Sequence, residues 1–187
     1  MNEGNDHFNA NRYEQATECY RRAIKINPKY ELAHHWLGLA LKKLGRYDEA
    51  IDSYKTALKL NPKYADAHCN LGLALNNLGR YDEAIDSYNT ALKLNPNDAI
   101  AHHNLGLALY SLGRYDEAID SYNTALKLNP KYAITHYNLG AALNSLGRYD
   151  EAIDSYNTAL KLNPKYANVH SNLGNALNSL GKYDEAI

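Results

Sequence analysis

The sequence carries almost no net charge. Its 187 residues include 20 lysines and arginines and 21 aspartates and glutamates, which gives a formal net charge of −1. Binding to nucleic acid or to an anionic membrane surface through the overall electrostatic field requires a marked excess of basic residues. The composition therefore predicts no nucleic-acid partner and no membrane partner, and it favours a partner that is recognised by shape and local chemistry.

Cysteines and long apolar runs are also scarce. No apolar run approaches the ~18 residues that a membrane-spanning helix needs, and the N-terminal stretch lacks the basic and then apolar layout of a signal peptide. The two cysteines, Cys19 and Cys69, fit reduced thiols of a reducing compartment better than a disulfide framework. The sequence therefore predicts a soluble, cytoplasmic protein.

What the sequence does contain is a repeat. The segment from Leu71 to Pro96 recurs almost unchanged from Leu105 and again from Leu139, and the prolines recur every 34 residues. A fixed period of this length predicts stacked supersecondary units rather than one globular core. With position 1 of the repeat at Glu31, the chain divides into a partial unit, four full units and a second partial unit: 1–30, 31–64, 65–98, 99–132, 133–166 and 167–187.

Each unit is predicted to contain two helices. Leu71, Ala74, Leu75 and Leu78 place an apolar stripe on the first helix, which ends at a glycine. The second helix is predicted over residues 81–94, with acidic residues in its first turn and a lysine in its last. Its apolar face comprises Ala84, Ile85, Tyr88, Ala91 and Leu92. An Asn-Pro pair then ends the helix, since proline disfavours the helical conformation of the preceding residue.

A second set of glycines lies inside the first helices, where each costs about 1 kcal/mol relative to alanine. We expect these glycines to allow close approach of the partner helix, with small residues such as Ala84 on the facing side. Both glycine sets therefore have structural roles, and no phosphate-binding loop is predicted. The interior set is Gly4, Gly38, Gly72, Gly106, Gly140 and Gly174.

The sequence offers no catalytic or metal-binding constellation. Five of the eight histidines occupy position 4 of successive units, about 10 Å apart, and no two histidines are spaced to ligate one metal from a single helix. The pairs typified by Asp82 and Glu83 lie in the first turn of a helix, where they interact with its dipole. Glu3 and Asp6 replace a leucine and an alanine of the repeat, as expected of a solvated terminal cap. We therefore predict no metal, no cofactor and no enzymatic activity.

The repeat resembles the tetratricopeptide repeat (TPR) family. The matching residues of the second full unit are Leu71, Gly72, Ala84, Tyr88, Ala91 and Pro96, and the resemblance covers the whole chain. The chain departs from the family pattern by a histidine where tryptophan is common and a leucine where tyrosine is common. The resemblance implies an all-α, right-handed superhelical solenoid of antiparallel helix pairs that acts as a protein–protein interaction scaffold.

In this family the first helix of each unit lines a concave groove, so the resemblance also implies candidate site residues. Position 6 places a column of asparagines there, and their amides could hydrogen-bond the backbone of an extended peptide, as in the TPR superhelix of O-linked N-acetylglucosamine transferases. The alternative is that asparagine merely tolerates a wet helix face. The column comprises Asn70, Asn104, Asn138 and Asn172.

Position 5 varies between units, which is the pattern expected of residues that read side chains, although drift of exposed sites would look the same. It is occupied by His35, Cys69, His103, Tyr137 and Ser171, and further aromatic contacts are expected from Trp36 and Tyr110. The resemblance implies that positions 2, 5, 6, 9, 12 and 13 of each unit line the groove. From Glu31 onward, the only charged residues at these positions are Lys42, Lys43 and Asp66, so the peptide should be weakly charged.

Two other functions remain open from the sequence. The chain could be the substrate-recognition arm of a larger glycosyltransferase, or a self-assembling structural array. Leu173, Leu177 and Leu180 keep the internal pattern in the last unit, so we expect the last helix to expose an apolar face. Such a face predicts either a fragment of a longer array or end-to-end association of chains.

Overall fold

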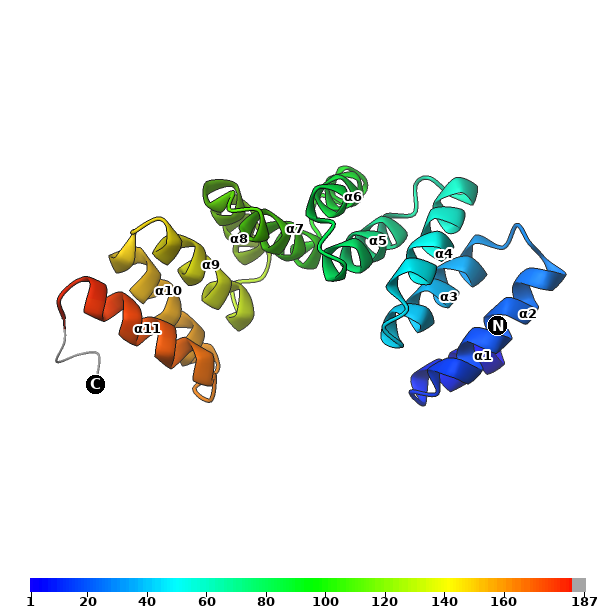
Figure 1. Cartoon of the computed structure of the whole chain (residues 1–187), viewed down its shortest axis with the longest axis horizontal. Helices are drawn as coiled ribbons and strands as arrows, with labels where there is room; N and C mark the ends of the chain where they lie inside the picture. Colours follow the sequence, from blue (N-terminus) through cyan, green and yellow to red (C-terminus); the bar gives the residue numbers. More distant parts are fainter. Residues whose placement is uncertain (183–187) are drawn as a thin grey trace. The chain divides into compact units, whose positions relative to one another are not determined.

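The computed structural model describes residues 1–182 (Figure 1). Within these residues the chain forms eleven α-helices and no β-strand. The helices are α1 (Asn2–Asn9), α2 (Tyr13–Ile26), α3 (Glu31–Lys43), α4 (Tyr47–Leu60), α5 (Ala65–Asn77), α6 (Tyr81–Leu94), α7 (Ala99–Ser111), α8 (Tyr115–Leu128), α9 (Ala133–Ser145), α10 (Tyr149–Leu162) and α11 (Ala167–Ser179). The chain divides into two compact units, Met1–Pro96 and Asn97–Ile187. No helix within residues 1–182 has the length and apolarity that crossing a membrane requires.

Consecutive helices pack as antiparallel pairs, which confirms the predicted all-α fold. In the first pair, Glu3 near the start of α1 meets Arg22 near the end of α2, at 3.4 Å. Further along α1, the amide oxygen of Asn5 accepts a hydrogen bond of 2.9 Å from the hydroxyl of Tyr20. Because contacts move backward along α2 as they move forward along α1, the two helices run in opposite directions.

Glycine ends the first helix of each pair, as predicted. After α5, Gly79 adopts a φ of 72°, and its N–H donates to the carbonyl of Asn76 at 3.0 Å. The N–H of Arg80 donates to the carbonyl of Leu75, also at 3.0 Å. These two bonds satisfy carbonyls that the helix end would leave unpaired, and the left-handed conformation at the glycine makes them possible. The same positive φ recurs at Gly45, Gly113, Gly147 and Gly181.

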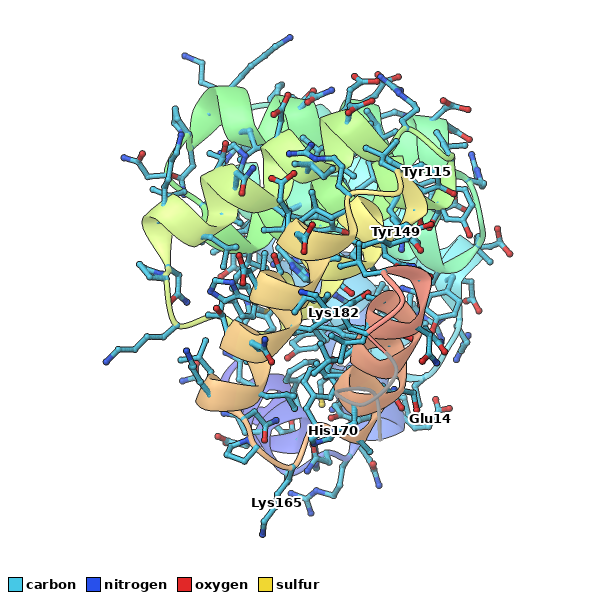
Figure 2. The ribbon with its side chains drawn as sticks, turned by 90° about the vertical axis from the view of Figure 1, so that its left-hand side faces the viewer. Glu14, Tyr115, Tyr149, Lys165, His170 and Lys182 are labelled. Atoms are coloured by element: carbon cyan, nitrogen blue, oxygen red, sulfur yellow. The ribbon has the colours of Figure 1, made fainter. Side chains whose placement is uncertain are left out.

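The Asn-Pro turn between units is held by two side-chain hydrogen bonds. The side-chain oxygen of Asn61 accepts from the backbone N–H of Lys63 at 3.2 Å, and Nε2 of His68 donates to the carbonyl of Pro62 at 3.0 Å. The histidine at position 4 therefore has a structural role, tying the first helix to the preceding turn. Equivalent His–Pro bonds join His34 to Pro28 and His136 to Pro130. In Figure 2, Lys165 and His170 mark the corresponding turn and helix of the last repeat.

The predicted apolar face of the second helix is buried, except for Leu92, which is half-buried. Tyr88 is its largest fully buried member. A Cβ built on Gly72 would lie 2.7 Å from the Tyr88 ring, so the glycine makes room for tyrosine. The expectation that Ala84 faces this glycine is wrong, because the tyrosine side chain reaches across the helix interface and fills the space.

The end of the last repeat differs from expectation. Leu177 is buried and Leu173 and Leu180 are half-buried, and α11 packs against α10 and α9. These leucines are therefore not left on an exposed face of α11. The second helix expected in the final partial unit starts after Lys182 and lies outside the described residues. End-to-end association stays a prediction.

Candidate functional site

The first helices of neighbouring repeats contact each other within each of the two compact units. In the first unit α3 contacts α5, and in the second unit α7 contacts α9 and α9 contacts α11. The side chains at position 6 of these helices could therefore form a column within each unit. Three of the four asparagines, Asn70, Asn138 and Asn172, are half-buried, whereas Asn104 is buried.

Asn70 is already engaged by the fold. Its amide oxygen accepts a hydrogen bond of 2.7 Å from the ammonium group of Lys42 on α3, and its amide nitrogen donates to the carbonyl of Asp66 at 2.9 Å. Burial lowers the pKa of Lys42 to about 8, and Lys43 adds to this effect, while Cys69 opposes it. An asparagine amide has two donor hydrogens and two acceptor lone pairs, so Asn70 keeps one of each for a ligand.

In the second compact unit, Asn172 and two tyrosines are held by contacts between the first helices of neighbouring repeats. The amide nitrogen of Asn172 on α11 donates to the hydroxyl of Tyr137 on α9 at 3.1 Å. The hydroxyl oxygens of Tyr110 on α7 and Ser145 on α9 lie 3.4 Å apart. Both tyrosines are half-buried, so each keeps part of its ring accessible while its hydroxyl is positioned by the neighbouring helix.

Asn138 on α9 is the more accessible of the two column members without a side-chain hydrogen bond in residues 1–182; the other, Asn104, is buried. It shares a face of α9 with Ser145, two turns further along the helix. Among the residues that the structure describes, its amide takes part in no side-chain hydrogen bond. Its half-buried amide therefore retains its full capacity for a ligand.

Position 5 does not form an exposed column. The exposed fractions of His35, Cys69 and His103 are only 4%, 9% and 5%. The expectation that these side chains read a peptide therefore conflicts with their burial. The rings of Tyr64 and Tyr132 lie against His35 and His103, respectively. At the three buried residues the variation is one of core packing, whereas Tyr137 is half-buried and Ser171, at position 5 of the last partial unit, is exposed.

The two buried histidines are kept neutral by their surroundings. The His35 ring lies 4.6 Å from that of Tyr64, and burial, assisted by Lys42, lowers the pKa of His35 to about 4. Burial alone lowers the pKa of His103 to about 4. Nδ1 of His103 lies 2.9 Å from the hydroxyl of Thr135, which can donate to the neutral ring. In the neutral form, these rings avoid the free-energy cost of placing a charge in the core.

Trp36 belongs to an aromatic cluster of the first unit. Its ring centroid lies 5.6 Å from that of Phe8 in an edge-on arrangement and 6.4 Å from that of Tyr20 in a stacked one. The indole is half-buried. Packing therefore accounts for much of its surface, and the remainder is available for a ligand.

The second unit also contains a hollow that the sequence did not indicate. It has a volume of about 500 Å³, and its lining includes Asn123 of α8, His136 of α9 and Asp154 of α10. None of the predicted site residues lines it. No pattern in the sequence could reveal this hollow, since it depends on the spacing between neighbouring pairs.

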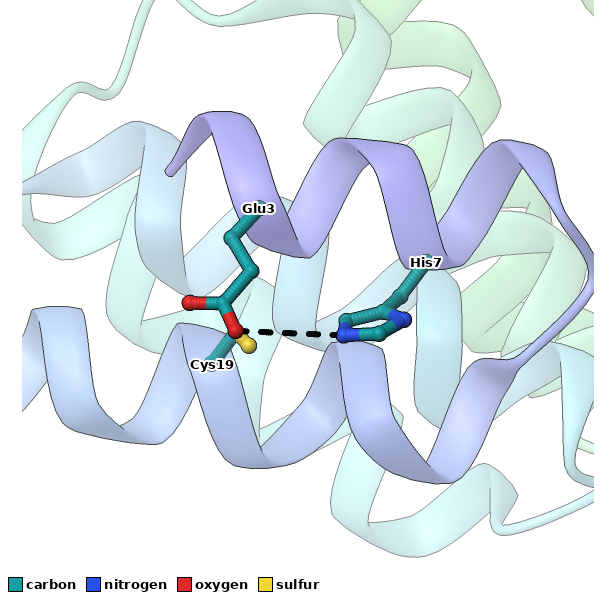
Figure 3. Close-up of side chains that lie close together, drawn as sticks. All are labelled: Glu3, His7 and Cys19. Carbon is teal, nitrogen blue, oxygen red and sulfur yellow. Dashed lines mark ion pairs between the residues drawn. The ribbon is translucent and has the colours of Figure 1, made fainter.

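Three potential metal ligands that sequence analysis did not assign meet in the first pair (Figure 3). The carboxylate of Glu3, the imidazole of His7 and the thiol of Cys19 each offer a ligand atom, and these atoms lie within 4.8 Å of one another. From the sequence alone, Glu3 is expected to belong to a solvated cap. The missed signal was the combination of residue types at facing positions of two helices.

Comparison with known proteins places the chain in a family. Residues 1–187 match the sequence profile described as the cilia and flagella-associated protein 70 C-terminal domain, a TPR profile. The chain belongs to this TPR family. A search of curated proteins finds no match to this TPR chain.

Solved TPR structures agree with the fold. A MamA crystal structure matches with a TM-score of 0.83 and 28% identity, over 90% of this chain and 98% of that one. TTC0263, a thermophilic TPR protein of Thermus thermophilus, matches with a TM-score of 0.72 and 28% identity, over 95% and 97%. YrrB, described as a TPR protein with an unusual peptide-binding site, matches with a TM-score of 0.78 and 24% identity, over 90% and 87%.

Proposed function

We propose that this TPR protein is an interaction scaffold that binds an extended, weakly charged peptide through the asparagines of its first helices. The observation that carries the proposal is Asn138, whose half-buried amide is uncommitted on α9, next to Tyr137 in sequence and two turns before Ser145, the residue that contacts Tyr110. An extended backbone presents alternating N–H and C=O groups, and an asparagine amide can pair with both. The column would therefore fix the peptide without reading its sequence.

The aromatic residues would supply the apolar part of the interface. Tyrosine rings whose hydroxyls are already held lose little conformational freedom on binding, which favours affinity. Tyr110 is held by Ser145 and Tyr137 by Asn172, so both rings are preorganised. The residues at groove positions in this unit are uncharged, and a strongly charged peptide would gain no compensating ion pair from them.

The solved structures support the fold of the scaffold rather than its binding site. YrrB is described as having a peptide-binding site, but at 24% identity its likeness to this chain concerns the fold. The support for peptide binding here comes from the asparagines and tyrosines of the chain itself.

The proposal is tested with a peptide selected on the whole chain from a displayed library of random extended peptides. Replacing Asn138 by alanine should weaken binding of that peptide by about 1–3 kcal/mol, roughly 5- to 150-fold in Kd, if the amide makes two backbone hydrogen bonds. The matched control is Asn157→Ala, which removes an exposed asparagine from the second helix α10. Calorimetric titration of the three proteins gives the affinities.

The result that would refute the proposal is equal affinity for Asn138→Ala and the parent chain, with both variants folded by circular dichroism. Weakening by Asn157→Ala alone would move the site to the face formed by the second helices. Selection of strongly acidic or basic peptides would contradict the predicted ligand class.

A further inference from the structure

The first helix pair brings three metal-binding groups together from two helices. Glu3 and His7 lie one turn apart on α1, with the carboxylate oxygen 4.0 Å from Nε2 of the imidazole, and Cys19 faces them from α2. The close-up in Figure 3 shows the three side chains converging in the interface between α1 and α2. Cys19 is buried, His7 is half-buried and Glu3 is exposed, so the cluster is open to solvent on one side.

The other repeats show that this cluster is a coordinated departure from the repeat. Position 7 holds Glu3 in the first pair but leucine in every later copy, position 11 holds His7 but leucine in every later copy, and position 23 holds Cys19 but serine in every later copy. The leucines at the first two positions are Leu37, Leu71, Leu105, Leu139 and Leu173, and Leu41, Leu75, Leu109, Leu143 and Leu177; the serines are Ser53, Ser87, Ser121 and Ser155.

A solvated cap explains only part of this departure. Polar residues at positions 7 and 11 would suit a terminal helix, but a cap has no need of cysteine at position 23, where serine is already polar. All three replacements introduce a metal-ligand type, and all three occur at positions that face one another. A solvated cap alone requires neither the ligand types nor their convergence.

The geometry is close to that of a tetrahedral site. With zinc–ligand distances of about 2.0–2.3 Å, the ligand atoms of a tetrahedral site are separated by roughly 3.4–3.6 Å. The present separations are no greater than 4.8 Å. Rotation of the exposed Glu3 side chain and a small movement of the imidazole would shorten these separations to tetrahedral values. Neither change requires the helices to move.

The imidazole is oriented for ligation. Nε2 of His7 faces Glu3, while Nδ1 is buried and has no hydrogen-bond partner among the described residues. A proton on Nδ1 leaves the lone pair on Nε2, which is the form that binds a metal. Since no outer partner supports Nδ1, the site lacks one interaction that strengthens many metal-bound histidines.

A cationic side chain already occupies part of the cluster. One guanidinium nitrogen of Arg22 lies 3.0 Å from the sulfur of Cys19 and 3.4 Å from the carboxylate of Glu3. The Cys19 sulfur and the Glu3 carboxylate therefore already bind a positively charged group. The Arg22 side chain is 65% exposed, so it can swing into solvent when a metal ion takes its place.

We propose that Glu3, His7 and Cys19 form a binding site for a divalent transition-metal ion, with zinc as the best match to this nitrogen, oxygen and sulfur donor set. Binding releases the thiol proton to solvent, forms bonds from the metal to the thiolate, imidazole and carboxylate, and leaves the fourth position to water. The ion would join α1 to α2 and stabilise the first helix pair.

Cobalt(II) provides a direct test, because it substitutes for zinc and shows thiolate-to-metal charge-transfer absorption only when sulfur is a ligand. Titration of the reduced, tag-free chain should produce this absorption with one equivalent of cobalt, and zinc should abolish it. Cys19→Ser should remove the absorption, and Cys69→Ser should leave it unchanged. His7→Leu should weaken affinity by more than the ~10- to 100-fold that loss of an outer-shell partner costs.

His7→Leu and Cys19→Ser restore the residues of the later repeats, so both variants are expected to fold. Circular dichroism checks this. Arg22→Thr, which also restores the repeat residue, should strengthen binding because it removes the competing cation. Absence of thiolate absorption in the parent chain, or its persistence in Cys19→Ser, would overturn the proposal. Weaker binding by Arg22→Thr would overturn the placement of the ion between Cys19 and Glu3.

Discussion

Stability should fall between neutral and mildly acidic pH because two histidines are buried in neutral form. Burial lowers the pKa of His35 and of His103 to about 4, against about 6.5 in an unfolded chain. Between these values the unfolded chain binds protons that the folded chain does not, so the free energy of unfolding rises with pH. The contribution of each histidine is fully present above about 6.5 and is lost as the pH falls toward 4.

The size of the effect follows from the two pKa values. From about pH 7 to about pH 5, each histidine should reduce the free energy of unfolding by about 2 kcal/mol. Glu49, Glu83, Glu117 and Glu151 do not obscure this range, because hydrogen bonds from arginines hold the pKa of each carboxyl below its usual value. Their stabilising contribution is lost only at lower pH.

Urea denaturation followed by circular dichroism at a series of pH values measures the effect. The double variant His35→Gln/His103→Gln should lose most of the pH dependence in this range, whereas His170→Gln should keep it because His170 is exposed on α11. Unfolding midpoints are compared, since repeat arrays can depart from two-state behaviour. A parent chain whose midpoint is unchanged over this range would refute the burial argument, as would a double variant that retains the parental dependence.

Two further predictions concern the contact between glycine and tyrosine in each pair. Gly72→Ala should destabilise the chain by about 1–3 kcal/mol through overpacking against Tyr88, offset by up to about 1 kcal/mol of helix propensity; a higher midpoint of thermal unfolding would show that the ring can move aside. Tyr88→Phe should be neutral or stabilising because it removes a buried hydroxyl without a hydrogen-bond partner in residues 1–182, whereas Tyr20→Phe should cost about 1 kcal/mol by breaking the bond to Asn5. Equal effects of the two phenylalanine variants in thermal unfolding would contradict the assigned difference.

The sequence predicted the helices better than the site because their signals are local. Gly79 and Pro96 end helices through backbone constraints that act within a few residues, and the structure agrees with both. The side chain that packs against Gly72 could not be predicted in the same way, since this contact depends on how far the Tyr88 side chain reaches across the interface between the two helices. The burial of His35 likewise depends on Tyr64 of the turn that precedes the next helix, which the period of the repeat does not reveal.

Comparison between copies separates structural from functional residues in this chain. Tyrosine at position 24 is buried in every described pair, but only Tyr20 has a hydrogen-bond partner at position 9, because Asn5 stands where the next four copies have leucine or alanine. The first pair thus carries polar replacements at several facing positions, including Glu3 and Cys19. Independent drift would leave most such residues opposite an unchanged apolar partner. Their convergence on facing positions of α1 and α2, with three metal-ligand types among them, is the observation that favours the proposed metal site over a simple polar cap.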